Sequence, residues 1–327
     1  MALSAARGAF LRQVRWSGWE TAFWAAWALA FFVPQANLVL LTHVLIWGLF
    51  ALSLDLLLGQ RGIASLGHAA FYGIGAYVAG FLGKWGWTEP VSGLLLSALA
   101  AGLVGLGVGR VLRGLQGVAL LMVTLGLNML LYDAAQRATD ITGGDDGLQG
   151  VVVAPLLGSF RFDMAGRTGY LYVLAVVLMV ALAVRALQHG PWGLALLGAR
   201  DSARRMLLLG APVERDVTLV FGLSAAIAGL AGALMTQTTG FVSPEALSFQ
   251  RSADVLVVLV IGGTGMLYGG FVGALLFLAM RDLLAALNPI YWYFWIGLLL
   301  VLVVSFFRAG IVPTLCRLWL KRRGVGA

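Results

Sequence analysis

The chain has 327 residues, of which 61% are hydrophobic and 11% are charged, and its formal net charge is +8. A soluble domain carries roughly a quarter of charged residues, so this apolar excess must face lipid and a single water-soluble core is excluded. The arginines and lysines lie in short segments between apolar runs, as membrane orientation requires, so the positive charge does not indicate a nucleic-acid partner.

The apolar runs predict an all-α integral membrane protein with about ten transmembrane helices, because each crossing takes roughly 20 apolar residues. Breaks at charges, prolines and glycine clusters place them at 21–34, 38–58, 63–83, 91–110, 117–136, 168–187, 217–238, 252–267, 270–287 and 290–307. The divisions at Pro34 and between Gly262 and Gly273 are the weakest, so eight or nine spans remain open. Residues 1–327 thus form a single transmembrane domain.

The distribution of basic residues predicts the orientation. With ten spans, most of the 22 lysines and arginines fall on the cytoplasmic side if both termini are cytoplasmic. Residues 137–167 are then a periplasmic loop, and residues 309–327 are a basic cytoplasmic tail. Residues 188–216 are cytoplasmic, and within them Gly198–Leu209 reads as a short basic helix ended by Gly210.

Small residues predict closely packed helices. The chain has 44 glycines, and small residues recur every four positions in two rows: Ala101, Gly105 and Gly109, and Ala225, Gly229 and Ala233. Ten spans also divide into five plus five, and an odd-numbered repeat must insert in opposite senses, so we expect an inverted repeat.

Enzymatic motifs are absent from the sequence. The only lysines are Lys84 and Lys321, and neither follows a phosphate-binding glycine loop, so energy from ATP would have to come through another chain. No Gly-x-Ser-x-Gly or His-Glu-x-x-His motif occurs, and the single cysteine, Cys316, offers no disulfide or metal spacing.

The polar residues inside the spans are the candidate functional residues, because an ionisable side chain in hydrocarbon costs about 3 kcal/mol. They are Asp55, His68, Asp133, Arg281 and Asp282. The last three lie near span ends, where a structural ion pair is an equal alternative. His68 is either a packed histidine or a solute contact. Thr124 and Asn128 share one helix face, which can line a route through the membrane.

Six motifs follow one another in an order that resembles a known family. They are Gly59-Gln60 with Ser65-Leu66-Gly67-His68-Ala69-Ala70-Phe71 and Gly73-Ile74-Gly75-Ala76-Tyr77; Thr124-Leu125-Gly126; Thr142-Gly143-Gly144-Asp145-Asp146-Gly147-Leu148; Ala228-Gly229-Leu230-Ala231-Gly232-Ala233-Leu234; Gly240-Phe241-Val242-Ser243-Pro244-Glu245; and Gly262-Gly263-Thr264-Gly265 with Gly269, Gly270, Gly273 and Ala274. From about residue 40 to 308 the chain resembles branched-chain amino-acid ABC permeases of the LivM type.

This resemblance implies a permease of an importer in the bacterial inner membrane. Its partners would be a second, LivH-like permease subunit, two cytoplasmic ATP-binding subunits, a periplasmic solute-binding protein and membrane lipid. The chain would bind no cofactor, since ATP and Mg would be used by the partner subunits. Transport would proceed by ATP-driven alternating access rather than by chemistry on the solute.

The resemblance also assigns expected roles to residues. The substrate pathway would include Ser65, Gly67, His68, Thr124, Asn128, Ser243 and Glu245. Gating and close packing would involve Gly262, Gly263, Gly265 and Gly269. Coupling to the ATPase would involve Gly193, Arg200, Asp201, Arg204, Arg205 and Gly210. Two positions depart from the family pattern: Leu194 stands where a basic residue is common, and Ser202 stands where asparagine is common.

The solute remains open at this point. A branched-chain or other small apolar amino acid is the first expectation, and similar systems carry urea, short amides or aromatic acids. A self-sufficient ion-coupled carrier or channel would need ion ligands at a helix break, and no convincing carboxylate cluster is present. A membrane-embedded transferase would need paired catalytic groups, and the aspartates are isolated.

Overall fold

The computed structural model describes residues 18–33, 37–156, 160, 163, 166–287, 291, 294–295, 297–298, 301 and 310–314. Its elements are α2 (Gly18–Ala30), α3 (Leu38–Asp55), the π-helical turn η1 (Leu56–Arg61), α4 (His68–Lys84), α5 (Pro90–Val111), α6 (Gly117–Arg137), α7 (Thr139–Thr142), η2 (Gly144–Asp146), α8 (Arg167–Gln188), α9 (Pro191–Leu208), α10 (Val213–Thr239), η3 (Pro244–Leu247), α11 (Phe249–Gly262) and α12 (Gly269–Leu287). Across these residues the fold is all-α, as predicted, and no sheet forms beyond two isolated bridges.

Six helices are long and apolar enough to cross a membrane, so the chain is a multi-pass membrane protein. They are Leu38–Arg61, Pro90–Val111, Gly117–Arg137, Arg167–Gln188, Val213–Thr239 and Gly269–Leu287, close to six of the predicted spans. Three further helices occupy predicted spans but are shorter than a full crossing: α2, α4 and α11 have 13, 17 and 14 residues. The tenth predicted span, 290–307, and the tail 309–327 lie mostly outside the described residues. The predicted count of ten is therefore not confirmed.

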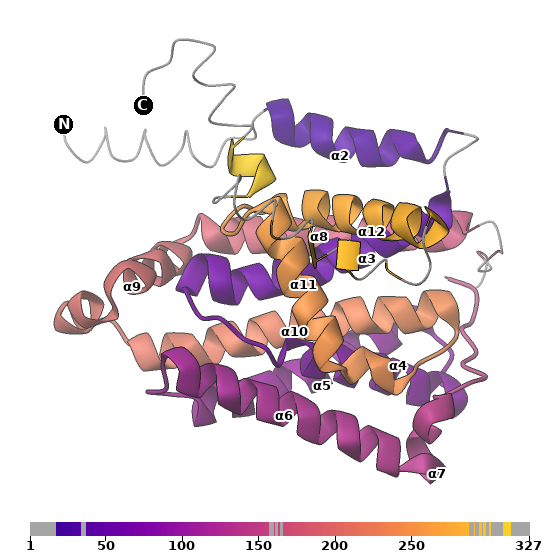
Figure 1. The fold of residues 1–327 in the computed structure, drawn as a ribbon, viewed down its shortest axis with the longest axis horizontal. Coiled ribbons are helices and arrows are strands. Elements are labelled where there is room, and N and C mark those ends of the chain that lie inside the picture. Colours follow the sequence, from indigo (N-terminus) through magenta and orange to yellow (C-terminus); the bar gives the residue numbers. More distant parts are fainter. Residues whose placement is uncertain are drawn as a thin grey trace.

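The long helices run lengthwise and stack across the molecule (Figure 1). At one end lies α9, and α7 lies at the other. Helices α9 and α7 belong to segments that the sequence places on opposite sides of a membrane, and they lie at opposite ends of the molecule.

Two helices form the centre of the bundle. Within the apolar windows of the span that begins with α3 and of α10, 72% and 78% of the residues are buried, against 22% for α6. The central helix α10 packs against α3, α4 and α5, and α3 also packs against α8, α11 and α12. The outer position of α6 explains why its exposed residues are apolar, as in Met122, Met129 and Leu130.

The two predicted rows of small residues pack against each other. A Cβ atom added to Gly105 would lie less than 3.0 Å from the side chain of Ala225, and one added to Gly229 would lie equally close to that of Ala101. On the other side of α10, a Cβ on Gly232 would overlap the carbonyl oxygen of Tyr72 in α4. Small residues therefore set the distance of α10 from both α5 and α4, which confirms the predicted close packing.

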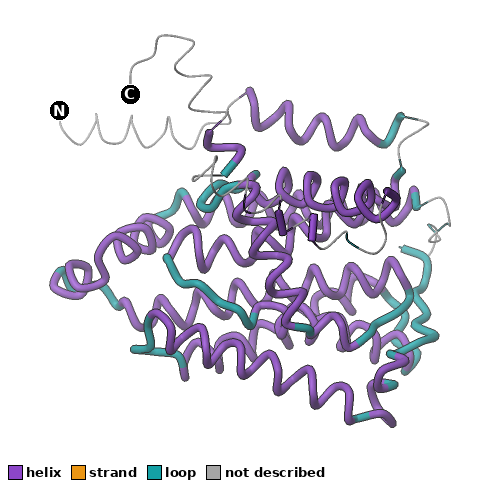
Figure 2. The backbone as a smooth tube through the Cα atoms, in the orientation of Figure 1, coloured by secondary structure: helices purple, strands orange, loops and turns teal. Residues whose placement is uncertain are grey.

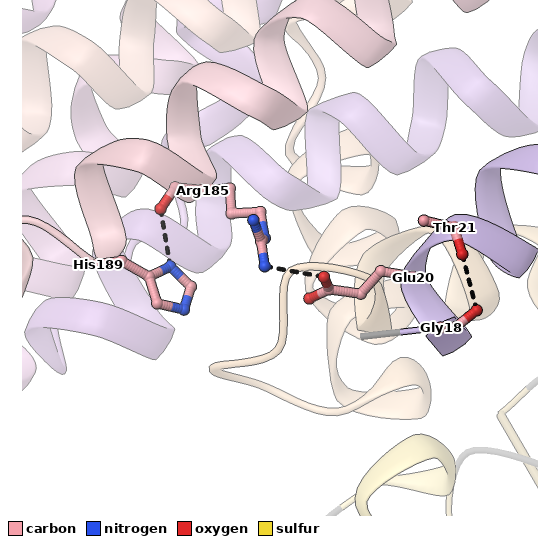
Figure 3. A network of polar contacts seen from close by, with 5 residues as sticks. All are labelled: Gly18, Glu20, Thr21, Arg185 and His189. Atoms are coloured by element: carbon pink, nitrogen blue, oxygen red, sulfur yellow. Dashed lines mark hydrogen bonds and ion pairs between the residues drawn. The ribbon is translucent and has the colours of Figure 1, made fainter. Parts of the chain in front are cut away.

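The first described helix is tied to the bundle by a few polar contacts (Figure 3). The guanidinium of Arg185 in α8 forms an ion pair with Glu20 in α2 at 2.8 Å, and both side chains are largely buried. The hydroxyl of Tyr170 in α8 donates to the carbonyl of Trp27 at 2.6 Å. A short helix that could not span hydrocarbon alone is thus fixed to a longer one.

Candidate functional site

The chain between η1 and α4 is not helical, although the sequence predicts a continuous span over 63–83. Gly62 ends η1 with a φ of +75°, a left-handed conformation that glycine adopts without steric cost. Helix α4 begins only at His68. Figure 2 shows the intervening loop running from the α9 end into the middle of the bundle. The helix of the predicted span therefore starts five residues later than expected, and its first turn lies inside the protein.

Side chains from other helices satisfy the backbone of this loop and of the first turn of α4. The amide of Leu66 donates to the Thr124 hydroxyl at 3.3 Å, and the amide of Ala69 donates to the Ser252 hydroxyl at 2.9 Å. Ser65 is fully buried, and its own hydroxyl accepts from the amide of Gly67 at 3.3 Å. Non-helical backbone at this depth is tolerated because protein groups replace the missing helical hydrogen bonds.

His68 is fully buried at the start of α4. Its Nε2 atom lies 2.8 Å from the Ser53 hydroxyl oxygen and 3.5 Å from that of Ser224, and its ring stacks on Phe50 with centroids 5.6 Å apart. Ser224 in turn donates to the carbonyl of Ser53 at 2.5 Å. In this conformation His68 is a packed histidine that connects α3, α4 and α10.

We expect His68→Ala to lower the stability of the protein by about 2–4 kcal/mol, since it removes a stacked ring and the Ser53 contact and leaves a cavity. The measurement is the apparent melting temperature in detergent. The control is His43→Ala, because His43 is half-buried and lies outside this cluster. If both variants have the same melting temperature as the unchanged protein, His68 does not hold these helices together.

Thr124 and Asn128 share the buried face of α6, as predicted. A Cβ on Gly67 would overlap the carbonyl of Thr124, so α6 and the loop touch at backbone level. The Asn128 amide donates to the carbonyl of Leu247 in η3 at 3.0 Å. Both residues therefore fix the backbones of the loop and of η3, and their side chains are at most 2% exposed.

The two expected pathway residues after α10 lie in different surroundings. Ser243 lines a cavity of about 110 Å³ between α4, α10, η3 and α11, together with Tyr72, Thr236 and Arg251. Glu245, two residues later in η3, is exposed. The structure thus brings Ser243 to an internal surface and leaves Glu245 on the outside. Arg251, one residue before the predicted span 252–267, was not among the predicted pathway residues.

The glycines between α11 and α12 form a tight turn. Gly263 and Gly265 have φ values of +109° and +79°, which strongly favour glycine. A Cβ on Gly262 would overlap the carbonyl of Gly269, and one on Gly269 would overlap that of Gly263. All four glycines predicted for gating or close packing therefore belong to one turn in which no side chain fits or φ is positive.

This turn is bonded to the end of α3. Asp55 is 1% exposed, and its Oδ1 atom accepts from the amide of Gly265 at 2.6 Å. A Cβ on Gly59, one turn further along, would overlap the same carboxylate oxygen. The buried carboxylate of Asp55 thus stabilises the backbone of the glycine turn by a hydrogen bond. The sequence could not reveal this role, because Asp55 and Gly265 are far apart in the chain.

The helix in the predicted coupling segment is longer than expected and lies against η1. Helix α9 begins at Pro191 rather than at Gly198, because proline fits the first turn of a helix, and non-helical angles at Ser202 divide it. Arg61 Nη1 donates to the carbonyl of Ala199 at 3.1 Å, and Arg200 donates to the carbonyl of Gly59. Helix α9 is therefore anchored to η1 through its first half.

The remaining coupling residues lie on either side of that anchor. Gly193 is buried, and a Cβ there would overlap the carbonyl of Gln188. Asp201, Arg204 and Arg205 are exposed. Gly210 ends the segment with a φ of +82°, as the sequence predicts for a helix terminus.

The interior polar groups described above hold backbone segments and helices in place. Across the described part of the chain, no group of three or more His, Cys, Asp or Glu side chains could hold a metal ion. Asp55 and His68, two of the buried ionisable residues, contact a backbone amide and two serine hydroxyls, respectively. The structure thus has three features of interest. They are the break before α4 inside the bundle, the cavity beside Ser243, and the glycine turn between α11 and α12, which lies near α9.

The model of the family described as "Branched-chain amino acid transport system / permease component" matches residues 37–304. The chain is 31% identical over 312 residues to the high-affinity branched-chain amino acid transport system permease protein LivM of Escherichia coli, covering 88% of this chain and 72% of LivM. It is 23% identical to LivH of the same organism over 70% of this chain and 79% of LivH, and 24% identical to BraD of Pseudomonas aeruginosa over the same shares. No solved structure matches the chain significantly. The chain therefore belongs to the family of permease components of branched-chain amino acid transport systems.

Proposed function

We propose that the chain is the LivM-like permease subunit of an ATP-driven importer for branched-chain or similar small apolar amino acids. The observation that carries this proposal is the family match over residues 37–304, together with relatives whose names state branched-chain amino acid transport. The broken helix before α4 and the cavity beside Ser243 fit a solute route.

The assembly that we propose contains a second, LivH-like permease, two cytoplasmic ATP-binding subunits and a periplasmic solute-binding protein. The chain itself binds no cofactor and is not an enzyme, and ATP with Mg acts on the partner subunits. It lies in the inner membrane with about ten spans in an inverted repeat, and both termini are cytoplasmic. Residues 137–167 face the periplasm and residues 188–216 meet the ATPase.

Purification of the tagged chain from its host in mild detergent tests this proposal. A second permease and ATP-binding subunits are expected to co-purify, and the reconstituted complex should import leucine only when ATP is present. Uptake of urea, short amides or aromatic acids in place of leucine would assign a different solute to the same importer class. If the chain purifies alone and transports without ATP, it is a self-sufficient carrier.

The exposed end of α9 is the proposed ATPase contact. Its first half is anchored to η1 within the chain, whereas Arg204 and Arg205 are exposed after the break at Ser202. We expect the double variant Arg204→Ala, Arg205→Ala to lower the recovery of ATP-binding subunits by about tenfold, because charged contacts at an interface are commonly worth more than 1 kcal/mol.

The control for this docking prediction is Arg137→Ala. The Arg137 side chain is 80% exposed and belongs to the opposite end of the molecule, where it pairs with Asp133 at 2.7 Å. It should leave recovery unchanged. If the unchanged chain, the double variant and Arg137→Ala all recover the same amount of ATP-binding subunits, the ATPase contact lies elsewhere.

A further inference from the structure

A small cavity lies toward the end of α10 that is remote from α9. It has a volume of about 110 Å³, is partly open, and lies between α4, α10, η3 and α11. Four hydroxyl-bearing residues line it, namely Tyr72, Thr236, Thr239 and Ser243, and so does the guanidinium-bearing Arg251. The rest of the lining is mainly apolar. An enclosed cavity of about 150 Å³ holds benzene, so this space is larger than one water needs, and a solute bigger than benzene would extend out through its open side.

Arg251 is held beside this cavity by aromatic rings. Its Cζ atom lies 5.0 Å from the ring centroid of Trp47 and 6.0 Å from that of Tyr72. Within the described residues it forms no ion pair, and the carboxylate of Asp254, one turn later, accepts instead from the amide of Gln250 at 2.9 Å. The ring faces attract the guanidinium but do not neutralise its charge.

The positive charge at this place is not offset by the backbone. Arg251 stands in the first turn of α11, where its amide donates to the Ser248 side chain at 3.1 Å. A helix N-terminus carries partial positive charge, so the helix adds to the charge of Arg251 rather than balancing it. The cavity therefore presents a positive site at an apolar wall, which is the arrangement that a carboxylate completes.

A series of neighbouring rings leads from Tyr72, at the cavity lining, to His68. The ring of Tyr72 lies 4.6 Å from that of Phe50, and Phe50 stacks on His68 at 5.6 Å. His68 then contacts Ser53 and Ser224. A solute in the cavity would thus be separated from the broken helix by these rings.

We propose that this cavity is a binding station for a zwitterionic amino acid, with Arg251 binding its α-carboxylate. The inference rests on the proposed function and adds a binding site to it. The fork of Arg251 can donate two parallel hydrogen bonds to the carboxylate. The hydroxyl oxygens of Ser243 and Thr239 can accept from the ammonium group, and the apolar wall, which includes Met235 and Ala246, suits the apolar side chain.

The first test measures leucine import by the complete reconstituted transporter. Arg251→Gln, which keeps a polar side chain and removes the charge, should lower import by at least about tenfold, and Arg251→Lys should be intermediate because it keeps the charge without the fork. The control is Arg137→Gln, since Arg137 is 80% exposed and pairs with Asp133 at 2.7 Å. Import by Arg251→Gln within twofold of the unchanged protein would overturn the site.

A second measurement separates binding from folding. Binding of labelled L-leucine to the purified complex without binding protein should be competed by 4-methylpentanoate, which keeps the carboxylate, and not by 3-methylbutylamine, which lacks it. Arg251→Gln should lose this competition. Competition by the amine alone would show that Arg251 does not recognise a carboxylate.

A third variant keeps Arg251 and fills the cavity. Ala246→Leu adds three carbon atoms at the lining, so it should lower leucine import more than alanine import. Equal effects on both amino acids would contradict a binding role for this space. If the unchanged transporter imports neither amino acid, the proposed function itself fails, and that outcome is distinct from an active transporter that is insensitive to these changes.

Discussion

Gly262→Ala is expected to abolish leucine import and to destabilise the protein by about 3 kcal/mol. The added methyl group would lie less than 3.0 Å from the carbonyl oxygen of Gly269, an atom of the backbone that no side-chain movement can relieve. Helices α11 and α12 meet at this point, and Gly263 follows with a φ of +109°. The two helices must therefore separate, which disturbs the turn that contacts Asp55.

The melting temperature in detergent and the import rate of the reconstituted complex measure the effect of Gly262→Ala. Gly126→Ala is the matched control, because Gly126 lies within α6 and a Cβ there meets no atom within 4 Å. Alanine in a helix should stabilise it by up to about 1 kcal/mol. If Gly262→Ala melts and transports like this control, the close approach of α11 to α12 is not required for function.

Helix packing was the part of the fold that the sequence could predict best. Apolar length and breaks placed the six long helices, and the four-residue spacing of Ala101, Gly105 and Gly109 identified the face of α5 that meets α10. Thr124 and Asn128 were correctly placed on one face because helical periodicity is a local property. These features depend on residues close together in the chain.

The break before α4 could not be predicted in the same way. Residues 63–67 are largely apolar, so hydropathy alone continues the span. Their non-helical course is stabilised by Thr124 and Ser252, which come from helices distant in the sequence. Hydropathy reports how apolar a segment is and does not report whether another helix supplies its hydrogen bonds.

The candidate site shows the same limit. Ser243 was named from its motif, whereas Arg251 was not among the predicted pathway residues. Its role depends on Trp47 from α3 and Tyr72 from α4, and only the tertiary fold brings these rings to it. Asp55 is a similar case, since its partner Gly265 is 210 positions away.

The second large effect is expected from Arg200→Ala, which should separate ATP hydrolysis from import. Arg200 donates to the carbonyl of Gly59, and its side chain contacts the position of Gly62, where η1 ends. Asp55, at the start of η1, accepts a hydrogen bond from the amide of Gly265 in the glycine turn. If α9 meets the ATPase as proposed, this chain of contacts carries its movement to the interior.

We therefore expect the Arg200→Ala complex to assemble and to hydrolyse ATP at about the normal rate, while leucine import falls by about tenfold. A charge-assisted hydrogen bond is worth about 1.5 kcal/mol at the low end of its range, and this loss gives about a tenfold effect if the bond stabilises one state of the transport cycle. The measurement is the ratio of leucine imported to ATP hydrolysed, with Arg137→Ala as the control at the opposite end. A parallel fall of hydrolysis and import would assign Arg200 to docking instead. An unchanged ratio at full import would show that movement of α9 reaches the glycine turn by another route.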